Sequence, residues 1–259
     1  MTKVALLQIA IRDDETNDQR LQRGLAMLRN LDRVVQLAIL PELWTVGFFA
    51  FENYASSATP VPGTASEQLA AAARELKIWL HAGSIVERSN EGIHNTSLLF
   101  NPEGRLEARY RKIHLFGYES EEATLLKAGS APQIAQTPLG AIGLSTCYDL
   151  RFPELYRAMS KEGAEIFLVA SAWPYPRLEH WLVLNRARAI ENLAYVVACN
   201  AAGRTRGRQL LGNSVVVDPW GVPIARAGGE EQVLYAQLDR ELVHEVRSRF
   251  PALTDRRLG

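Results

Sequence analysis

Cys147 lies in a segment whose residue order suits a catalytic nucleophile. The apolar run at 141–145 predicts a buried strand, and Pro153 opens a predicted helix over 153–161. A cysteine between such a strand and helix stands at a sharp turn that exposes its side chain, and a nearby helix N-terminus favours the reactive thiolate. A lone cysteine is more often a packing residue, so Cys147 needs support from other residues.

Two further side chains could supply that support. Glu42 directly follows an apolar run at 34–40, so it stands where a buried strand leaves its sheet, which is where active sites of α/β folds gather. Lys112 follows an alternating segment at another strand end. Each residue by itself is better explained as a solvated surface charge. The combination with Cys147 changes that interpretation.

A thiol, a carboxylate and an ammonium group form a workable set for acyl transfer from nitrogen. The carboxylate of Glu42 would take the proton of the Cys147 thiol and later return it to the leaving amine. The sulfur would attack the carbonyl and hold the acyl group as a thioester. The Lys112 ammonium, with a backbone N–H beside the cysteine, would stabilise the tetrahedral oxyanion. The three residue types therefore predict hydrolysis of an amide.

Short apolar runs alternate with amphipathic stretches along the chain, which predicts a layered α/β or α+β domain. We expect strands at 4–10, 34–40, 79–86, 95–100, 141–145, 166–171, 195–200 and 214–217, and helices around 21–31, 66–77, 153–161 and 179–193. The segment NTSLLFNPEG at 95–104 resembles NSVVVDPWG at 213–221, and both predict a strand that enters a Pro-x-Gly turn. Such an internal repeat is typical of two similar sheets packed face to face. No linker divides the chain, so we expect one domain over 1–259, with 240–259 as a C-terminal tail.

Composition argues against several classes of protein. Lys plus Arg equals Asp plus Glu at 29 each, without the basic excess of a nucleic-acid binder. Apolar runs are too short to cross a bilayer, and Cys147 and Cys199 make neither a disulfide framework nor a zinc motif. The five histidines show no metal-ligand spacing. We therefore expect a cytoplasmic enzyme that uses no metal or other cofactor and binds neither nucleic acid nor membrane.

Three blocks of the sequence resemble those of the nitrilase superfamily of carbon–nitrogen hydrolases. They are LPEL at 40–43, YRKIHLF at 110–116 and TCYDLRFPE at 146–154, supported by ASAWP at 170–174 and RAIEN at 188–192. Their order and separation also match, and the resemblance extends from Val4 to about Asp239. Within the superfamily the chain is similar to the omega-amidase branch, which hydrolyses the terminal amide of 2-oxoglutaramate and similar short acids.

The resemblance implies a four-layer α-β-β-α sandwich that forms homodimers, or higher oligomers, through its helices. It implies that Glu42 is the general base, Lys112 the oxyanion stabiliser and Cys147 the nucleophile. A second glutamate that orients the lysine aligns with Glu122, although Glu119 and Glu121 are close neighbours.

The resemblance also suggests three substrate contacts. Tyr148, directly after the nucleophile, would offer its backbone N–H to the oxyanion. Arg151 matches the arginine with which carbamoyl amino acid hydrolases bind the substrate acid, and a guanidinium suits a carboxylate. A structural ion pair with Asp149 or Glu154 is an equal alternative for Arg151. Trp173 follows a predicted strand and would form the pocket floor, or else pack in the core.

Three alternatives to an omega-amidase remain open at this stage. The substrate could be deaminated glutathione, an N-carbamoyl compound, a neutral aliphatic amide or a nitrile. A cysteine–histidine hydrolase could use His114 or His180 as its base. A binding module could also have kept the fold without catalysis, although the presence of Glu42, Lys112 and Cys147 together argues against it.

Overall fold

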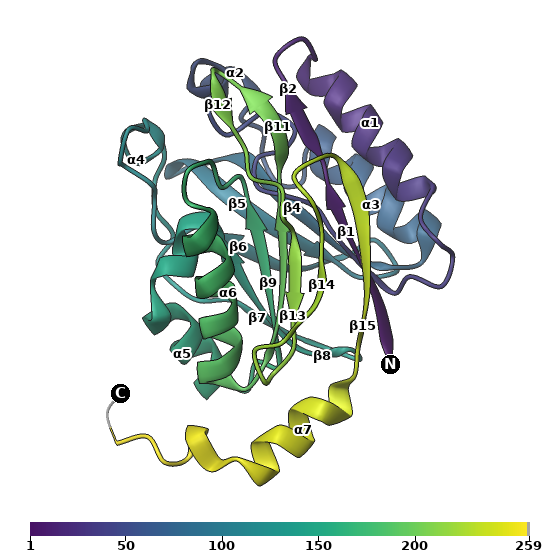
Figure 1. Ribbon diagram of the computed structural model, residues 1–259. Helices are drawn as coiled ribbons and strands as arrows, with labels where there is room; N and C mark the ends of the chain where they lie inside the picture. Colours follow the sequence, from purple (N-terminus) through teal and green to yellow (C-terminus); the bar gives the residue numbers. More distant parts are fainter. Residues whose placement is uncertain (258–259) are drawn as a thin grey trace.

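Two six-stranded sheets form the centre of the molecule (Figure 1). The computed structural model describes residues 1–257. The first sheet has the order β15-β1-β3-β4-β5-β6. Its strands are β15 (Gln232–Leu238), β1 (Thr2–Gln8), β3 (Leu37–Ile39), β4 (Trp79–Ser89), β5 (Gly92–Phe100) and β6 (Leu106–Arg111).

The second sheet is built in a similar way. It has the order β14-β13-β10-β9-β8-β7, and its central strands β8, β9 and β10 run parallel. Its strands are β14 (Pro223–Arg226), β13 (Val215–Val217), β10 (Tyr195–Asn200), β9 (Ile166–Ser171), β8 (Gly140–Thr146) and β7 (Ile134–Thr137). Parallel strands buried on both faces explain the continuous apolar runs in the sequence.

Helices cover the outer face of each sheet (Figure 1). Helices α1 (Asn17–Arg29) and α3 (Thr64–Leu76) lie on the first sheet, and α5 (Pro153–Lys161) and α6 (Leu178–Asn192) lie on the second. Strand β1 shows how the layers meet. Its Val4 and Leu6 pack into the core shared with the second sheet, whereas Ala5 and Leu7 pack into the core beneath α1. The predicted four-layer α-β-β-α sandwich is confirmed.

The two similar segments at 95–104 and 213–221 form equivalent hairpins in the two sheets. Strand β5 pairs with β6, and β13 pairs with β14. Between the strands, the N–H of Gly104 bonds to the Asn101 carbonyl at 2.8 Å, and the N–H of Gly221 bonds to the Asp218 carbonyl at 2.9 Å. Both glycines have positive φ, +76° and +81°, which explains why each turn ends in glycine. The expectation of two similar sheets packed face to face is confirmed.

Some elements differ from the predictions. The strand expected at 34–40 is only Leu37–Ile39, because a turn precedes it and Val34 is exposed. A basic segment after β10 contains β11 (Ala202–Thr205) and β12 (Arg208–Gln209), which form a small sheet with β2 (Ala10–Arg12). Short helical elements also connect the layers: α2 (Tyr54–Ser57), α4 (Glu122–Leu125), η1 (Phe51–Asn53) and η2 (Cys147–Arg151).

The segment predicted as a C-terminal tail contains helix α7 (Arg240–Arg249) and a short helix η3 (Pro251–Leu253). Val243 and Val246 of α7 are buried, and the Arg247 guanidinium donates hydrogen bonds to the carbonyls of Ala164 and Leu193. Residues 240–253 therefore pack on the domain, and 258–259 lie outside the described residues. Among residues 1–257, no helix is long and apolar enough to span a membrane.

Candidate active site

Cys147 occupies the sharp turn that its sequence context predicts. It follows β8 and begins η2, with a positive φ of 48° and a side chain that is 7% exposed. A non-glycine residue rarely adopts this conformation, and such strained backbone is typical of active-site residues. The strand–turn arrangement thus places the sulfur just beyond the carboxyl end of β8.

Glu42 and Lys112 come from the first sheet and meet behind the thiol. Glu42 follows β3, Lys112 follows β6, and both side chains are fully buried. The Lys112 Nζ lies 2.8 Å from Glu42 Oε1. The other carboxylate oxygen, Oε2, accepts the backbone N–H of Ala172 at 3.0 Å, just beyond β9 of the second sheet. The site therefore joins the two sheets.

Glu122 is the glutamate that the fold brings to Lys112. Its two carboxylate oxygens lie 2.9 and 2.8 Å from the Lys112 Nζ, and its side chain is fully buried. Its neighbours Glu119 and Glu121 are exposed, and Glu119 pairs instead with Arg208. Of the three glutamates considered from the sequence, Glu122 has the position to orient the lysine.

Asn95, in β5, completes the cluster and is not anticipated by the sequence reasoning. Its Nδ2 donates to Glu42 Oε1 and to Glu122 Oε1, each at 2.8 Å. The signal was present in the sequence, since polar residues at 94–97 interrupt a strand that is otherwise apolar. A polar residue inside a buried strand needs a polar partner, and here the partners are the two carboxylates.

Burial and charge set the protonation of this cluster. Burial by itself would lower the pKa of Lys112, but the carboxylates of Glu122 and Glu42 raise that pKa overall, so the ammonium form persists. Burial raises the pKa of Glu42 above its ordinary value of 4.5, against the opposing effect of Lys112. A carboxylate with a raised pKa is a better proton acceptor, which suits a general base.

The thiol has the opposite tendency from that expected. A helix N-terminus was expected to favour the thiolate, but burial and the negative charge of Glu42 raise the pKa of Cys147 well above its ordinary value. Burial is the larger cause, and the Cys147 side chain also lies next to a carboxylate, whereas the helix whose N-terminus was considered, α5, begins only at Pro153. The thiol is therefore the resting form, and its reaction requires a base.

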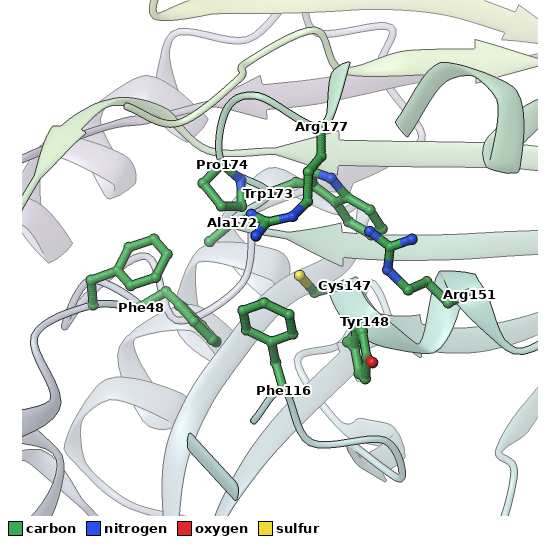
Figure 2. Close-up of a pocket in the computed structure, with 10 residues that line it drawn as sticks. Phe48, Phe116, Cys147, Tyr148, Arg151, Ala172, Trp173, Pro174 and Arg177 are labelled. Carbon is green, nitrogen blue, oxygen red and sulfur yellow. The ribbon is translucent and has the colours of Figure 1, made fainter. Parts of the chain in front are cut away.

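A pocket opens over the thiol (Figure 2). Five of its ten lining residues are aromatic, and Tyr148 and Phe116 are in edge-to-face contact at 5.0 Å between ring centroids. The lining residues are Phe48, Phe49, Phe116, Cys147, Tyr148, Arg151, Ala172, Trp173, Pro174 and Arg177.

The three predicted substrate contacts all line this pocket. Arg151 lies in η2, four residues after Cys147, and its guanidinium lies 4.8 Å from the Trp173 ring centroid. Within residues 1–257 it forms no ion pair with Asp149 or Glu154. Asp149 instead accepts from the Tyr110 hydroxyl and from His114. The geometry thus favours a role for Arg151 toward a ligand over a structural ion pair.

The histidines weighed as alternative bases lie elsewhere. The His114 ring contacts Asp149 through Nδ1 at 2.8 Å and stacks on Phe152 at 3.8 Å. His180 is exposed and lies 3.2 Å from Arg151 Nη2. Neither histidine lines the pocket. Glu42, in contrast, is close enough for its negative charge to raise the pKa of the Cys147 thiol. Within the described residues, no group of three or more His, Cys, Asp or Glu side chains could hold a metal ion.

A thiol, a carboxylate and an ammonium group that meet where two sheets join suit a cysteine hydrolase that acts on carbon–nitrogen bonds. The carbon-nitrogen hydrolase family model matches residues 3–248, and the chain belongs to that family. It is therefore an amide-hydrolysing enzyme of the nitrilase superfamily.

Individual relatives support the same classification. The chain is 40% identical to the 2-oxoglutaramate amidase of Paenarthrobacter nicotinovorans, over 98% of this chain and 89% of that one. The structure resembles Nit3 of Saccharomyces cerevisiae, with a TM-score of 0.91, 31% identity and coverage of 99% and 97%. It also resembles a variant amidase from Nesterenkonia sp. AN1 that carries the acetamide moiety of fluoroacetamide on its active-site cysteine. That comparison gives a TM-score of 0.86, 28% identity and coverage of 99% and 94%.

Proposed function

We propose that this enzyme hydrolyses the terminal amide of short ω-amidic acids such as 2-oxoglutaramate. The observation that carries this proposal is a small aromatic pocket that holds the Cys147 thiol together with an arginine, Arg151, that has no acidic partner among residues 1–257. A guanidinium without a counter-ion suits the carboxylate of such a substrate. The name of the relative from Paenarthrobacter nicotinovorans supports the same substrate class.

Each residue of the cluster has a role in the proposed reaction. Glu42 accepts the thiol proton while the Cys147 sulfur attacks the amide carbon. The Lys112 ammonium and the Tyr148 backbone N–H stabilise the oxyanion, and Glu122 holds the ammonium in position. The C–N bond then breaks, and ammonia leaves with the proton from Glu42. Glu42 next deprotonates a water molecule, which attacks the thioester and releases the acid and the thiol.

This role for Glu42 predicts an acid limb in the pH dependence of kcat/KM. The base must be ionised, so activity is present above the pKa of Glu42 and is lost as the pH falls through it. Because burial raises that pKa, we expect half of the activity to disappear at a pH above 4.5. A neutral amide should be used, so that the substrate does not titrate. A midpoint at or below 4.5 in a folded enzyme, checked by circular dichroism, would contradict the assignment.

Ammonia release from a panel of amides tests the proposed substrate class. The panel contains 2-oxoglutaramate, succinamate, a glutathione-like amide, an N-carbamoyl amino acid and butyramide, each with Cys147→Ala as the control. We expect the highest kcat/KM with the two short ω-amidic acids and no release by the variant. Release from the neutral or carbamoyl compounds alone would place the enzyme in another branch of its family.

We also propose a homodimer that forms through the helices of the second sheet. Support comes from exposed apolar side chains on and beside α6, namely Val183, Ile190, Trp220 and Val222, which are 48–57% exposed. A mass near the 28.8 kDa of one chain in light scattering would contradict a dimer.

We further propose a cytoplasmic location. Two free buried cysteines support it, and cell fractionation would test it.

A further inference from the structure

A second arginine, Arg177, reaches the pocket beside Arg151. These two residues carry the formal charges of the pocket lining, and both charges are positive. Among residues 1–257, neither guanidinium lies within ion-pair distance of an acidic side chain, and the only side-chain hydrogen bond of either is that of Arg151 with His180. No acidic side chain of the pocket lining therefore balances these two positive charges.

The backbone around Arg177 is fixed in place. The segment between β9 and α6 is joined to β12 by a hydrogen bond from the Tyr175 N–H to the Gln209 carbonyl, at 2.9 Å. Arg177 itself caps this segment through a hydrogen bond from its N–H to the Pro174 carbonyl, at 3.4 Å. The half-buried Arg177 side chain thus starts from an anchored loop, not a free one.

Aromatic rings, and not carboxylates, hold the Arg177 guanidinium. It lies 5.8 Å from the Phe116 ring centroid and 5.6 Å from the Tyr118 ring centroid. Contact with a ring uses the guanidinium as a cation and leaves its N–H groups available to an acceptor. Figure 2 shows Arg177 and Arg151 reaching the space around the Cys147 sulfur from different elements, with Trp173 beside them.

The two arginines also affect each other. Burial lowers the pKa of Arg151, and the positive charge of Arg177 lowers it further. Two like charges that share a partly buried pocket repel, and an anion placed between them relieves that repulsion. The site is therefore complementary to a negatively charged ligand whose amide carbon reaches Cys147.

We propose that Arg177 is a specificity-determining residue that binds the substrate carboxylate together with Arg151. The inference rests on the proposed function, since the ligand is the acid end of an ω-amidic acid. It adds that selection against neutral amides depends on two guanidinium groups from separate elements, η2 and the loop before α6. A neutral chain of equal length would leave both charges unsatisfied.

Kinetics with a matched pair of substrates test this role. Succinamate and butyramide have the same chain length, but succinamate ends in a carboxylate and butyramide ends in a methyl group. In Arg177→Gln we expect KM for succinamate to rise about 10- to 100-fold, as for loss of a charge-assisted hydrogen bond. The kinetic constants for butyramide should change less than about threefold. Arg177→Lys, which keeps the charge but loses the planar fork, should fall between Arg177→Gln and the wild type.

Arg208→Gln is the matched control. Arg208 also lies over an aromatic ring, at 5.0 Å from the Phe49 centroid, but it is already paired with Glu119. It does not line the pocket, so the ratio of the two substrates should stay that of the wild type. Equal effects of Arg177→Gln on succinamate and butyramide would overturn the proposal.

A binding measurement separates this inference from the proposed function. Calorimetry would compare succinate binding to Cys147→Ala and to Cys147→Ala/Arg177→Gln, without any turnover. We expect the double variant to bind at least about 10-fold more weakly. If the wild type releases ammonia from no amide, the proposed function fails, yet the succinate comparison still decides the role of Arg177. Equal succinate affinities, or no binding to either protein, would refute that role.

Discussion

Replacing Cys147 with serine is expected to lower kcat at least about 10⁴-fold and to leave the fold intact. The hydroxyl is a far poorer nucleophile beside a carboxylate base, and loss of a nucleophile that acts as one unit with its base costs most of the rate. Serine carries a single non-hydrogen atom on its Cβ, as cysteine does. The positive φ of 48° at this position therefore strains serine no more than it strains cysteine. The rate of ammonia release and the melting temperature together check this result.

Cys199→Ser is a matched control for this prediction. Cys199 is the second free cysteine, is fully buried in β10 and donates to the Leu7 carbonyl at 3.4 Å. It is outside the pocket, so its substitution should leave kcat within about twofold. Mass spectrometry of enzyme quenched during turnover should find the acyl group on the peptide that contains Cys147. Wild-type rates in Cys147→Ser, or an acyl group elsewhere, would refute the assignment.

The central elements of the fold could be predicted because apolar runs and strands coincide. The runs at 141–145, 166–171 and 195–200 became β8, β9 and β10, parallel strands that need apolar residues on both faces. Prediction failed where the pattern is weaker. Strand β15 lies at the edge of its sheet, and six of its seven residues are half-buried or exposed. Strands β11 and β12 lie in a basic segment. The pairing of such strands depends on distant partners and not on local residue order.

The site could be predicted only in part for a similar reason. The sequence motifs indicate Glu42, Lys112 and Cys147, but alternation by itself places Lys112 on an exposed surface, whereas the ammonium is fully buried between two carboxylates. Asn95 was missed because its partners are 53 and 27 residues away in the chain. Arg177 was missed because nothing in a proline-containing loop reveals which way a side chain points.

Lys112→Met is expected to affect both catalysis and stability strongly. Loss of an oxyanion donor should lower kcat about 10²- to 10³-fold. The substitution also leaves the carboxylates of Glu42 and Glu122 fully buried without their counter-ion, which should cost about 3–5 kcal/mol in the free energy of unfolding. A histidine-based mechanism through His114 or His180 predicts nearly unchanged kcat. Denaturant unfolding and steady-state kinetics give the two quantities.

The double variant Lys112→Met/Glu122→Gln keeps this prediction testable if the single variant does not fold. Removing one ammonium and one carboxylate together restores the charge balance of the cluster around Glu42, so much of the lost stability should return. Activity should not return, because the oxyanion still lacks its ammonium. Recovery of both would mean that Lys112 acts on the electrostatic balance of the core alone. Recovery of stability without turnover would separate its part in the reaction from its part in the fold.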